Sequence, residues 1–151
     1  MRLRELPTRW TTGAYVLHTG WQKWHGDQAT AQAVHAMATT AYPWLARLSP
    51  QRFLRLLAAT EITTGALLLT PIIPAPIAGA ALTGFSTGLL GLYARTPGLR
   101  QPGSIWPTPQ GLPISKDIWM LGIGLSLLTE ACPRHDDNLT ALTHHPHNKP
   151  T

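Results

Sequence analysis

The sequence predicts an all-α fold, a four-helix transmembrane bundle, and two apolar runs are the main reason. Residues 54–73 contain two charged side chains, Arg55 at the start and Glu61 inside, and residues 75–93 contain none. A helix of about 20 such residues is long enough to cross the apolar core of a bilayer. A helix on the surface of a soluble protein needs a polar face, which residues 75–93 lack. A soluble four-helix bundle is therefore the weaker alternative.

The four spans are expected at about residues 8–24, 52–73, 75–94 and 115–132. The outer two are shorter and more polar than the middle two, and their neighbours in a bundle would bury them. The first is expected to be retained rather than cleaved as a signal peptide, because His18, Gln22 and Lys23 interrupt it. Aromatic side chains near the segment ends match the belts found at membrane interfaces. They are Trp10, Trp21, Trp24, Trp44, Tyr93, Trp106 and Trp119.

The connections have their own compositions. The Ala-rich stretch 27–42 in the first loop is expected to form a short interfacial helix. The Pro-rich joint 70–79 suits a tight turn between antiparallel helices, and the prolines and glycines of 95–113 predict a loop. The membrane domain is therefore expected to cover 1–132, and the polar residues 133–151 to form a disordered tail. No metal site is predicted, since the tail histidines lack acidic or cysteine ligands; they are His144, His145 and His147.

Composition narrows the functional classes. The net charge is +5, but the basic residues flank apolar segments and form no stripe, so nucleic acid is not an expected partner. Cys132 is the single cysteine, which excludes an intrachain disulfide and a CxxC redox pair. A haem with two axial imidazoles is not expected either, because His18 is the one histidine well inside a predicted span.

Glu61 is the most informative residue. An ionised carboxylate near the centre of a membrane helix costs roughly 2.5–3.5 kcal/mol, so it must face the interior, be protonated or have a partner. On the first span, polar residues at helical spacing form one face that is expected to point inward. They are Thr11, Tyr15, His18 and Gln22. His18 is expected to hydrogen-bond Glu61, Lys23 ends the same helix, and Lys116 and Asp117 open the fourth.

These five side chains, Glu61, His18, Lys23, Asp117 and Lys116, form the candidate intramembrane polar site. Two interpretations stay open for it. The side chains either lock the helices together or form a proton-relay, quinone or small-ligand site. Separately, glycines are expected to permit close helix packing. They are Gly84 and Gly88 in the third span, and Gly122 and Gly124 in the fourth.

Three stretches resemble the DoxX-like family of small four-helix bacterial membrane proteins. They are HTGWQKW (18–24), ATEITTGALLL (59–69) and SKDIWMLGIGL (115–125). The likeness lies in Gly20 and Lys23 near the end of the first helix, in Glu61 followed by Gly65 in the second, and in Asp117 opening the fourth. It covers roughly residues 6–131, and the loops look like those of actinobacterial members.

The resemblance implies a multi-pass protein of the bacterial cell membrane. Family members include a subunit of a thiosulfate:quinone oxidoreductase and a membrane partner of superoxide and thiol detoxification enzymes. We therefore expect a membrane subunit or scaffold of a redox or oxidative-stress complex, which is not an enzyme by itself. Its expected partners are the lipid bilayer, a soluble oxidoreductase and a second copy of the chain.

Two alternatives remain. One is a quinone-reactive oxidoreductase subunit with an intramembrane proton path, in which quinone would be the only cofactor. The other is a small transporter, which is less favoured because the segments show no inverted repeat. Both termini are expected in the cytoplasm, mainly because the first residues are rich in arginine, although the overall distribution of Lys and Arg slightly opposes this.

Overall fold

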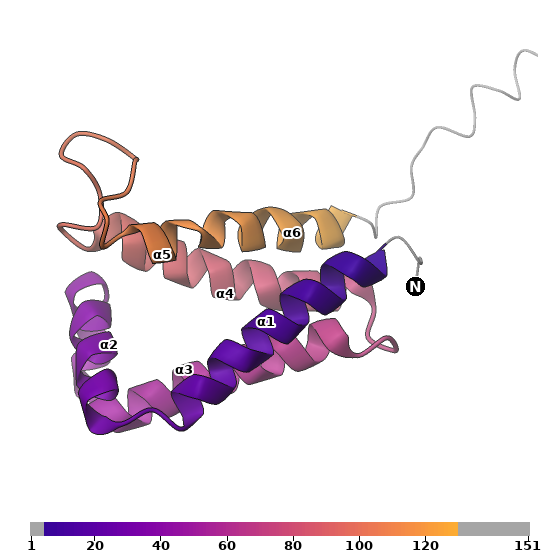
Figure 1. The fold of residues 1–151 in the computed structure, drawn as a ribbon, viewed down its shortest axis with the longest axis horizontal. Helices are drawn as coiled ribbons and strands as arrows, with labels where there is room; N and C mark the ends of the chain where they lie inside the picture. Colours follow the sequence, from indigo (N-terminus) through magenta and orange to yellow (C-terminus); the bar gives the residue numbers. More distant parts are fainter. Residues whose placement is uncertain (1–4, 130–151) are drawn as a thin grey trace, which may run out of the picture.

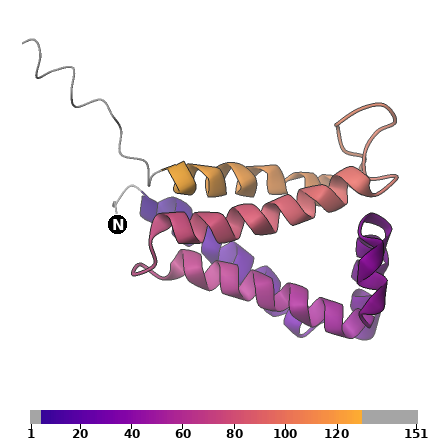
Figure 2. The same ribbon diagram turned by 180° about the vertical axis from the view of Figure 1, so that it is seen from behind.

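The computed structural model describes residues 5–129, which form helices joined by short connections and by one long loop, residues 96–111 (Figures 1 and 2). In chain order they are α1 (Leu6–Trp24), α2 (Gln28–Ala41), the 3-10 helix η2 (Pro43–Arg47), α3 (Pro50–Leu69), α4 (Ala75–Arg95), α5 (Leu112–Ser115) and α6 (Asp117–Thr129). Within these residues the only β pairing is one isolated bridge between Arg100 and Pro107. The all-α prediction is confirmed, and the predicted tail, 133–151, lies outside the described residues.

Local chemistry explains where the helices begin. Helices α1, α3, α4 and α5 each have a proline in the first turn, where its missing N–H costs nothing and its fixed φ suits a helix. Helix α2 begins differently, because the Asp27 carboxylate accepts a hydrogen bond from the Thr30 backbone N–H at 2.8 Å. Hydrogen bonding by the Thr30 side chain, together with this backbone interaction, holds the pKa of Asp27 below its usual value. The stretch 27–42 is therefore helical, as its composition predicts.

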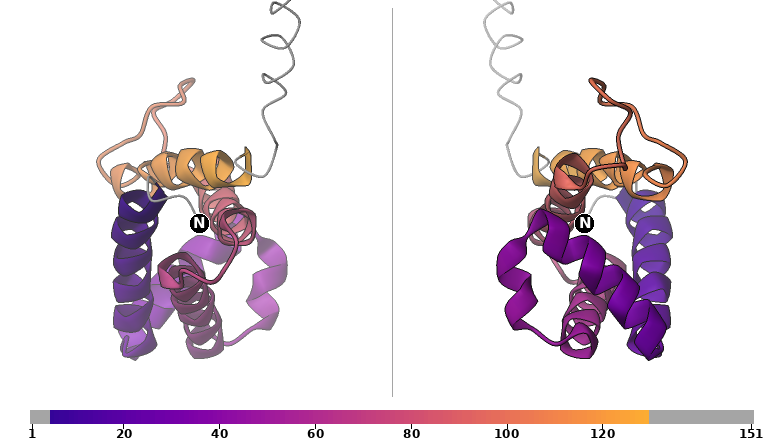
Figure 3. Two further views of the ribbon diagram at one scale, coloured as in Figure 1. Left: turned by 90° about the vertical axis from the view of Figure 1, so that its right-hand side faces the viewer. Right: turned by 90° about the vertical axis from the view of Figure 1, so that its left-hand side faces the viewer.

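The long helices are arranged as two pairs. Helix α1 packs along α3 and α4 packs along α6, while α3 and α4 connect the pairs more weakly. Helix α2 runs across one end of this arrangement, roughly perpendicular to the others (Figures 1 and 3). The start of α1, the end of α6 and the α3–α4 turn lie at the other end (Figure 1).

Glycines bring the backbones together in both pairs. A Cβ atom at Gly65 would lie 2.7 Å from the Leu17 nitrogen, and one at Gly20 would lie 2.9 Å from the Ile62 nitrogen, so neither crossing has room for a side chain. In the other pair, a Cβ atom at Gly79 would lie 2.8 Å from the Gly124 carbonyl oxygen. Small residues therefore set both helix crossings.

Of the four glycines expected to permit packing, Gly124 lies in the α4–α6 contact. The expectation is wrong for Gly84, Gly88 and Gly122, which have no atom of another element within 4 Å of a built Cβ. The reason is the helical turn: Gly84 follows the packed Gly79 by five residues, about 140° around the α4 axis. The glycine spacing in α4 was correct for a helix face, but that face points away from α6.

The described helices differ in their suitability for a membrane. Only α4 among them is both long enough and apolar enough to cross one. Helices α1 and α3 have similar lengths but are more polar, and the described part of α6 has 13 residues. Only a third of the apolar segment of α4 is buried within the protein, and the rest is partly or fully exposed. Length and composition thus indicate one candidate span.

Candidate functional site

An ion pair between α1 and α3 forms the centre of the candidate site. The Lys23 Nζ donates a hydrogen bond to the Glu61 Oε2 at 2.9 Å. The Glu61 side chain is only 4% exposed, whereas that of Lys23 is 29% exposed. The absence of a side chain at Gly20 makes this possible, because a Cβ there would lie 2.8 Å from the Glu61 Cβ. The crossing of the two helices thus brings the carboxylate against α1.

Asp117, the first residue of α6, adds a third charged group. Its partly buried carboxyl lies near enough to interact electrostatically with both Glu61 and Lys23. Three of the five predicted residues therefore lie within electrostatic range of one another, on three helices far apart in the sequence. With all three ionised, the cluster would carry one negative charge in excess, because a single ammonium faces two carboxylates.

The other two predicted residues lie elsewhere. His18 is exposed, and the expected hydrogen bond to Glu61 is not formed. His18 precedes Lys23 by five residues, which places it about 140° away around the α1 axis. Lys116 is also exposed.

The expectation that the polar face of α1 points inward is wrong for this structure. The buried face of α1 is instead made of Arg9, Gly13, Val16 and Gly20. Its glycines allow the backbone of α3 to approach, and this contact determines the orientation of the helix. The stripe of Thr11, Tyr15, His18 and Gln22 consequently lies on the exposed side.

The structure also identifies a residue that the sequence analysis did not single out. Arg9 is fully buried, and its guanidinium donates hydrogen bonds to four backbone carbonyls at 3.0–3.1 Å. The acceptors are Leu67, Leu68, Thr70 and Ile73. These carbonyls belong to the end of α3 and the turn after it, where backbone oxygens have no partner in the helix and the helix dipole favours a cation. The spacing of residues along α1 could have identified Arg9 as buried, because it lies on the same helix face as Gly13 and Gly20.

Two open grooves follow the outer side of α3, and we call them together the α3 groove. The first is lined by Trp24, Leu48, Gln51, Arg52, Arg55, Leu56 and Ala59. The second runs between α3 and α4 and is lined by Leu56, Ala59, Thr60, Thr63, Thr64, Leu67, Ala81, Gly84 and Phe85. The two grooves share Leu56 and Ala59 and therefore adjoin along the helix.

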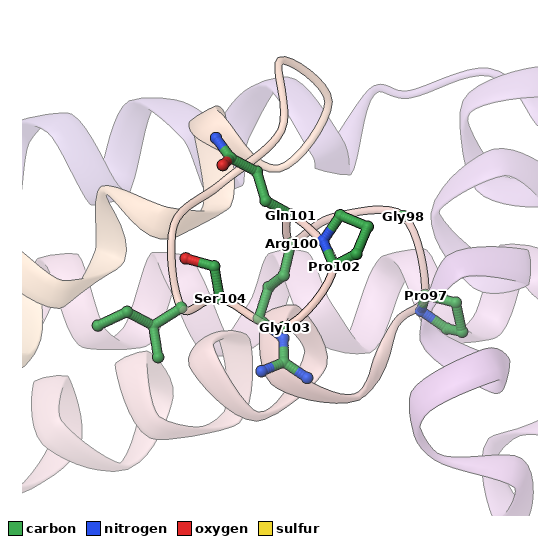
Figure 4. Close-up of a pocket in the computed structure, with 8 residues that line it drawn as sticks. Pro97, Gly98, Arg100, Gln101, Pro102, Gly103 and Ser104 are labelled. Atoms are coloured by element: carbon green, nitrogen blue, oxygen red, sulfur yellow. The ribbon is translucent and has the colours of Figure 1, made fainter.

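The loop between α4 and α5 holds a separate pocket (Figure 4). Its rim includes a turn closed by the Ser104 N–H donating to the Gln101 carbonyl at 3.0 Å, with Pro102 and Gly103 at the centre. Gly103 has a φ of +70°, which this kind of turn requires at its third residue. None of the charged cluster lines this pocket, and its one ionisable group is Arg100. The pocket therefore has no acid–base pair for chemistry.

In the described part of the chain, no group of three or more His, Cys, Asp and Glu side chains is arranged to hold a metal ion. The three tail histidines lie outside that part. The charged groups that the structure brings to the candidate site are thus Lys23, Glu61 and Asp117.

Comparison of the chain with protein-family models, with curated proteins and with solved structures found no match. The resemblance to the DoxX-like family therefore rests on the sequence motifs. Three residues of those motifs, Lys23, Glu61 and Asp117, are the ones that form the charged cluster.

Proposed function

We propose that the chain is a multi-pass, DoxX-like membrane protein that acts as a membrane subunit or scaffold of a redox or oxidative-stress complex. The observation that carries the proposal is a charged cluster in a bundle whose helices α4 and α6 have largely apolar exposed surfaces. Helix α6 is apolar on all sides, yet only Gly124 and Leu127 of its described residues are buried. In water such a surface would be costly, whereas in a bilayer it is the expected one.

The cluster suits a structural role in such a subunit. The Lys23–Glu61 pair joins α1 to α3, and Asp117 adds a charge at the start of α6 within electrostatic range of the pair. A charged pair away from water favours one arrangement of its helices, because any slip that separates the partners leaves a charge without compensation. A scaffold that presents a fixed surface to a soluble oxidoreductase would benefit from that constraint.

Membrane location is tested by washing membranes from cells that express the tagged full chain with alkaline carbonate. The proposal expects the chain to remain in the membrane pellet, together with a known multi-pass protein used as a reference. Release of the chain into the supernatant would end the multi-pass interpretation.

The scaffold role is tested by affinity purification from native membranes in mild detergent, followed by identification of the partners. We expect a soluble oxidoreductase to copurify, and Glu61→Gln to lower the thermal midpoint while leaving the activity of the complex intact. Lys116→Met, which removes an exposed charge next to Asp117, is the matched control and should change neither. The absence of any oxidoreductase among the partners would contradict the role.

Asp117 favours a second candidate function, a quinone-reactive subunit. Because two carboxyls share one ammonium, the cluster can exchange a proton, which quinone reduction needs, while the electrons would come from the partner enzyme. The chain purified together with the partner enzyme and supplied with that enzyme's electron donor should then reduce an added quinone, seen as a change in the quinone absorbance spectrum, and Glu61→Gln and Asp117→Asn should abolish the change. An unaltered spectrum in the unmodified protein would exclude this candidate.

A further inference from the structure

The first turns of α3 have an unusual charge distribution. The positive end of the helix dipole favours acidic side chains, but the first turn of α3 contains none and instead carries Arg52. Arg55 follows one turn later on the same side of the helix, so two like charges are neighbours. In the described part of the chain, neither guanidinium forms an ion pair with a carboxylate. An anion at this position would compensate for the cation at the positive end of the helix dipole and for the repulsion between the two arginines. It would also give both guanidiniums a partner.

The surroundings of the two arginines are amphipathic. The Arg55 guanidinium lies over the Trp24 indole, 5.1 Å from the ring centroid. Both arginines line the first part of the α3 groove, which has a volume of about 450 Å³. The start of α3 lies at the end of the molecule crossed by α2 (Figures 1 and 3), where a membrane protein of this shape would meet the headgroups.

From this charged end the α3 groove runs toward the middle of the helices. Arg52 and Leu67 are 15 residues apart, which corresponds to about 22 Å along α3, more than one leaflet of a bilayer. Gly84 opens the far part, because it has no side chain and no other element fills its place. Gly84 does not contribute to packing within the chain, but its missing side chain leaves room in the groove.

We propose that the α3 groove binds an anionic phospholipid, with its phosphate between Arg52 and Arg55 and one acyl chain extending past Leu56 and Ala59 toward Gly84. The inference rests on the proposed membrane location. Charge complementarity selects an anionic lipid over a zwitterionic one, because only the anionic headgroup leaves a net negative charge for the two guanidiniums. The apolar lining of the groove selects a lipid over a free phosphate.

The test is native mass spectrometry of the purified full chain, titrated in detergent with phosphatidylglycerol or phosphatidylcholine of equal chain length. We expect phosphatidylglycerol to bind about tenfold or more tightly than phosphatidylcholine, because each basic residue adds to the binding free energy of an anionic lipid. The double variant Arg52→Gln/Arg55→Gln should remove that preference. The matched control is Arg95→Gln/Arg100→Gln. It removes the same charge, including one arginine stacked on an aromatic ring, Tyr42, away from the groove.

A second variant tests the acyl path without touching the charges. Gly84→Leu should weaken binding of long-chain phosphatidylglycerol several-fold and leave a short-chain form unaffected, whereas Gly122→Leu on α6 should change neither. Both glycines have open space around a built Cβ, so neither substitution should unfold the chain.

Three results would overturn the inference. They are equal binding of the two lipids, equal loss in the control variant, and a dimer that Gly84→Leu dissociates, which would mean that a second copy occupies the groove. Release of the chain by carbonate would contradict the proposed function as well. Retention in the membrane without a phosphatidylglycerol preference would contradict this inference alone.

Discussion

At the scale of single residues, the buried Arg9 holds α1 against the end of α3 and the turn that follows it. Its guanidinium satisfies four carbonyls at the end of α3 and in the following turn. Arg9→Lys keeps the charge but replaces a planar fork with one ammonium, which cannot reach all four acceptors. We expect the free energy of unfolding to fall by at least about 3 kcal/mol, which would be measured as a lower thermal midpoint in detergent. Arg100→Lys, at an exposed site, should leave the midpoint unchanged.

The charged cluster predicts which of two substitutions, Lys23→Met or Glu61→Gln, destabilises the protein more. Lys23→Met leaves the buried Glu61 facing Asp117 without compensation, which costs roughly 3–5 kcal/mol for a buried pair. Glu61→Gln leaves Lys23 with Asp117 still nearby, so it should cost less. The double variant should recover part of the loss of Lys23→Met. Thermal midpoints of the four proteins form the cycle, and strictly additive losses would show that the two side chains are not coupled.

The outcome at these residues also explains the limits of sequence reading. Glu61 was singled out because a lone carboxylate in an apolar run needs a partner, and Lys23 and Asp117 were among its candidates. His18 was preferred as the partner because it is near the middle of a polar stripe. The rotation of α1 about its axis decides between them, and that rotation is set by contacts with α3 that no single segment reveals.

At the scale of elements, the crossing of α1 and α3 yields a prediction in which packing opposes helix propensity. Alanine is better than glycine in a helix by about 1 kcal/mol, so Gly→Ala is stabilising wherever space allows. At Gly65 the new Cβ would lie 2.7 Å from the Leu17 nitrogen, and overpacking of this kind costs about 1–3 kcal/mol. Gly65→Ala should therefore lower the thermal midpoint.

The matched control for that variant is Gly122→Ala, because a Cβ there meets nothing within 4 Å. It should raise the midpoint slightly or leave it unchanged. Equal effects of the two substitutions would contradict the assignment of Gly65 to a close helix crossing.

The positions of the elements were predictable to within a few residues for a physical reason. Apolar runs ended by prolines and glycines allow few alternatives, and both α4 and the Ala-rich α2 follow that rule. The faces were less predictable. Glycines occur at helical spacing on both sides of α4, and only the partner helix distinguishes Gly79, which packs, from Gly84, which does not.

At the scale of the whole molecule, hydropathy and packing carry different information. Helix α4 has the composition of a span, whereas α3 has charges at one end and Glu61 inside. Whether α3 also crosses depends on the neutralisation of Glu61 by Lys23, a contact between segments 38 residues apart. A four-span arrangement therefore cannot be deduced segment by segment, and its topology needs a direct test.

Helix α4 is 21 residues long, about 31 Å, and matches the apolar thickness of a bilayer. The flanking side chains Ile72 and Ile105 are 90% and 76% exposed. In a Cys132→Ala background the chain has no other cysteine, so Ile72→Cys and Ile105→Cys can be labelled one at a time.

With both termini in the cytoplasm, an impermeant maleimide should label position 105 in right-side-out vesicles and position 72 only in inside-out vesicles. The α3–α4 turn lies at the same end as the start of α1, which fixes this assignment (Figure 1). The reverse pattern would keep the span and invert the orientation, whereas labelling of both positions from one side would mean that α4 does not cross the membrane.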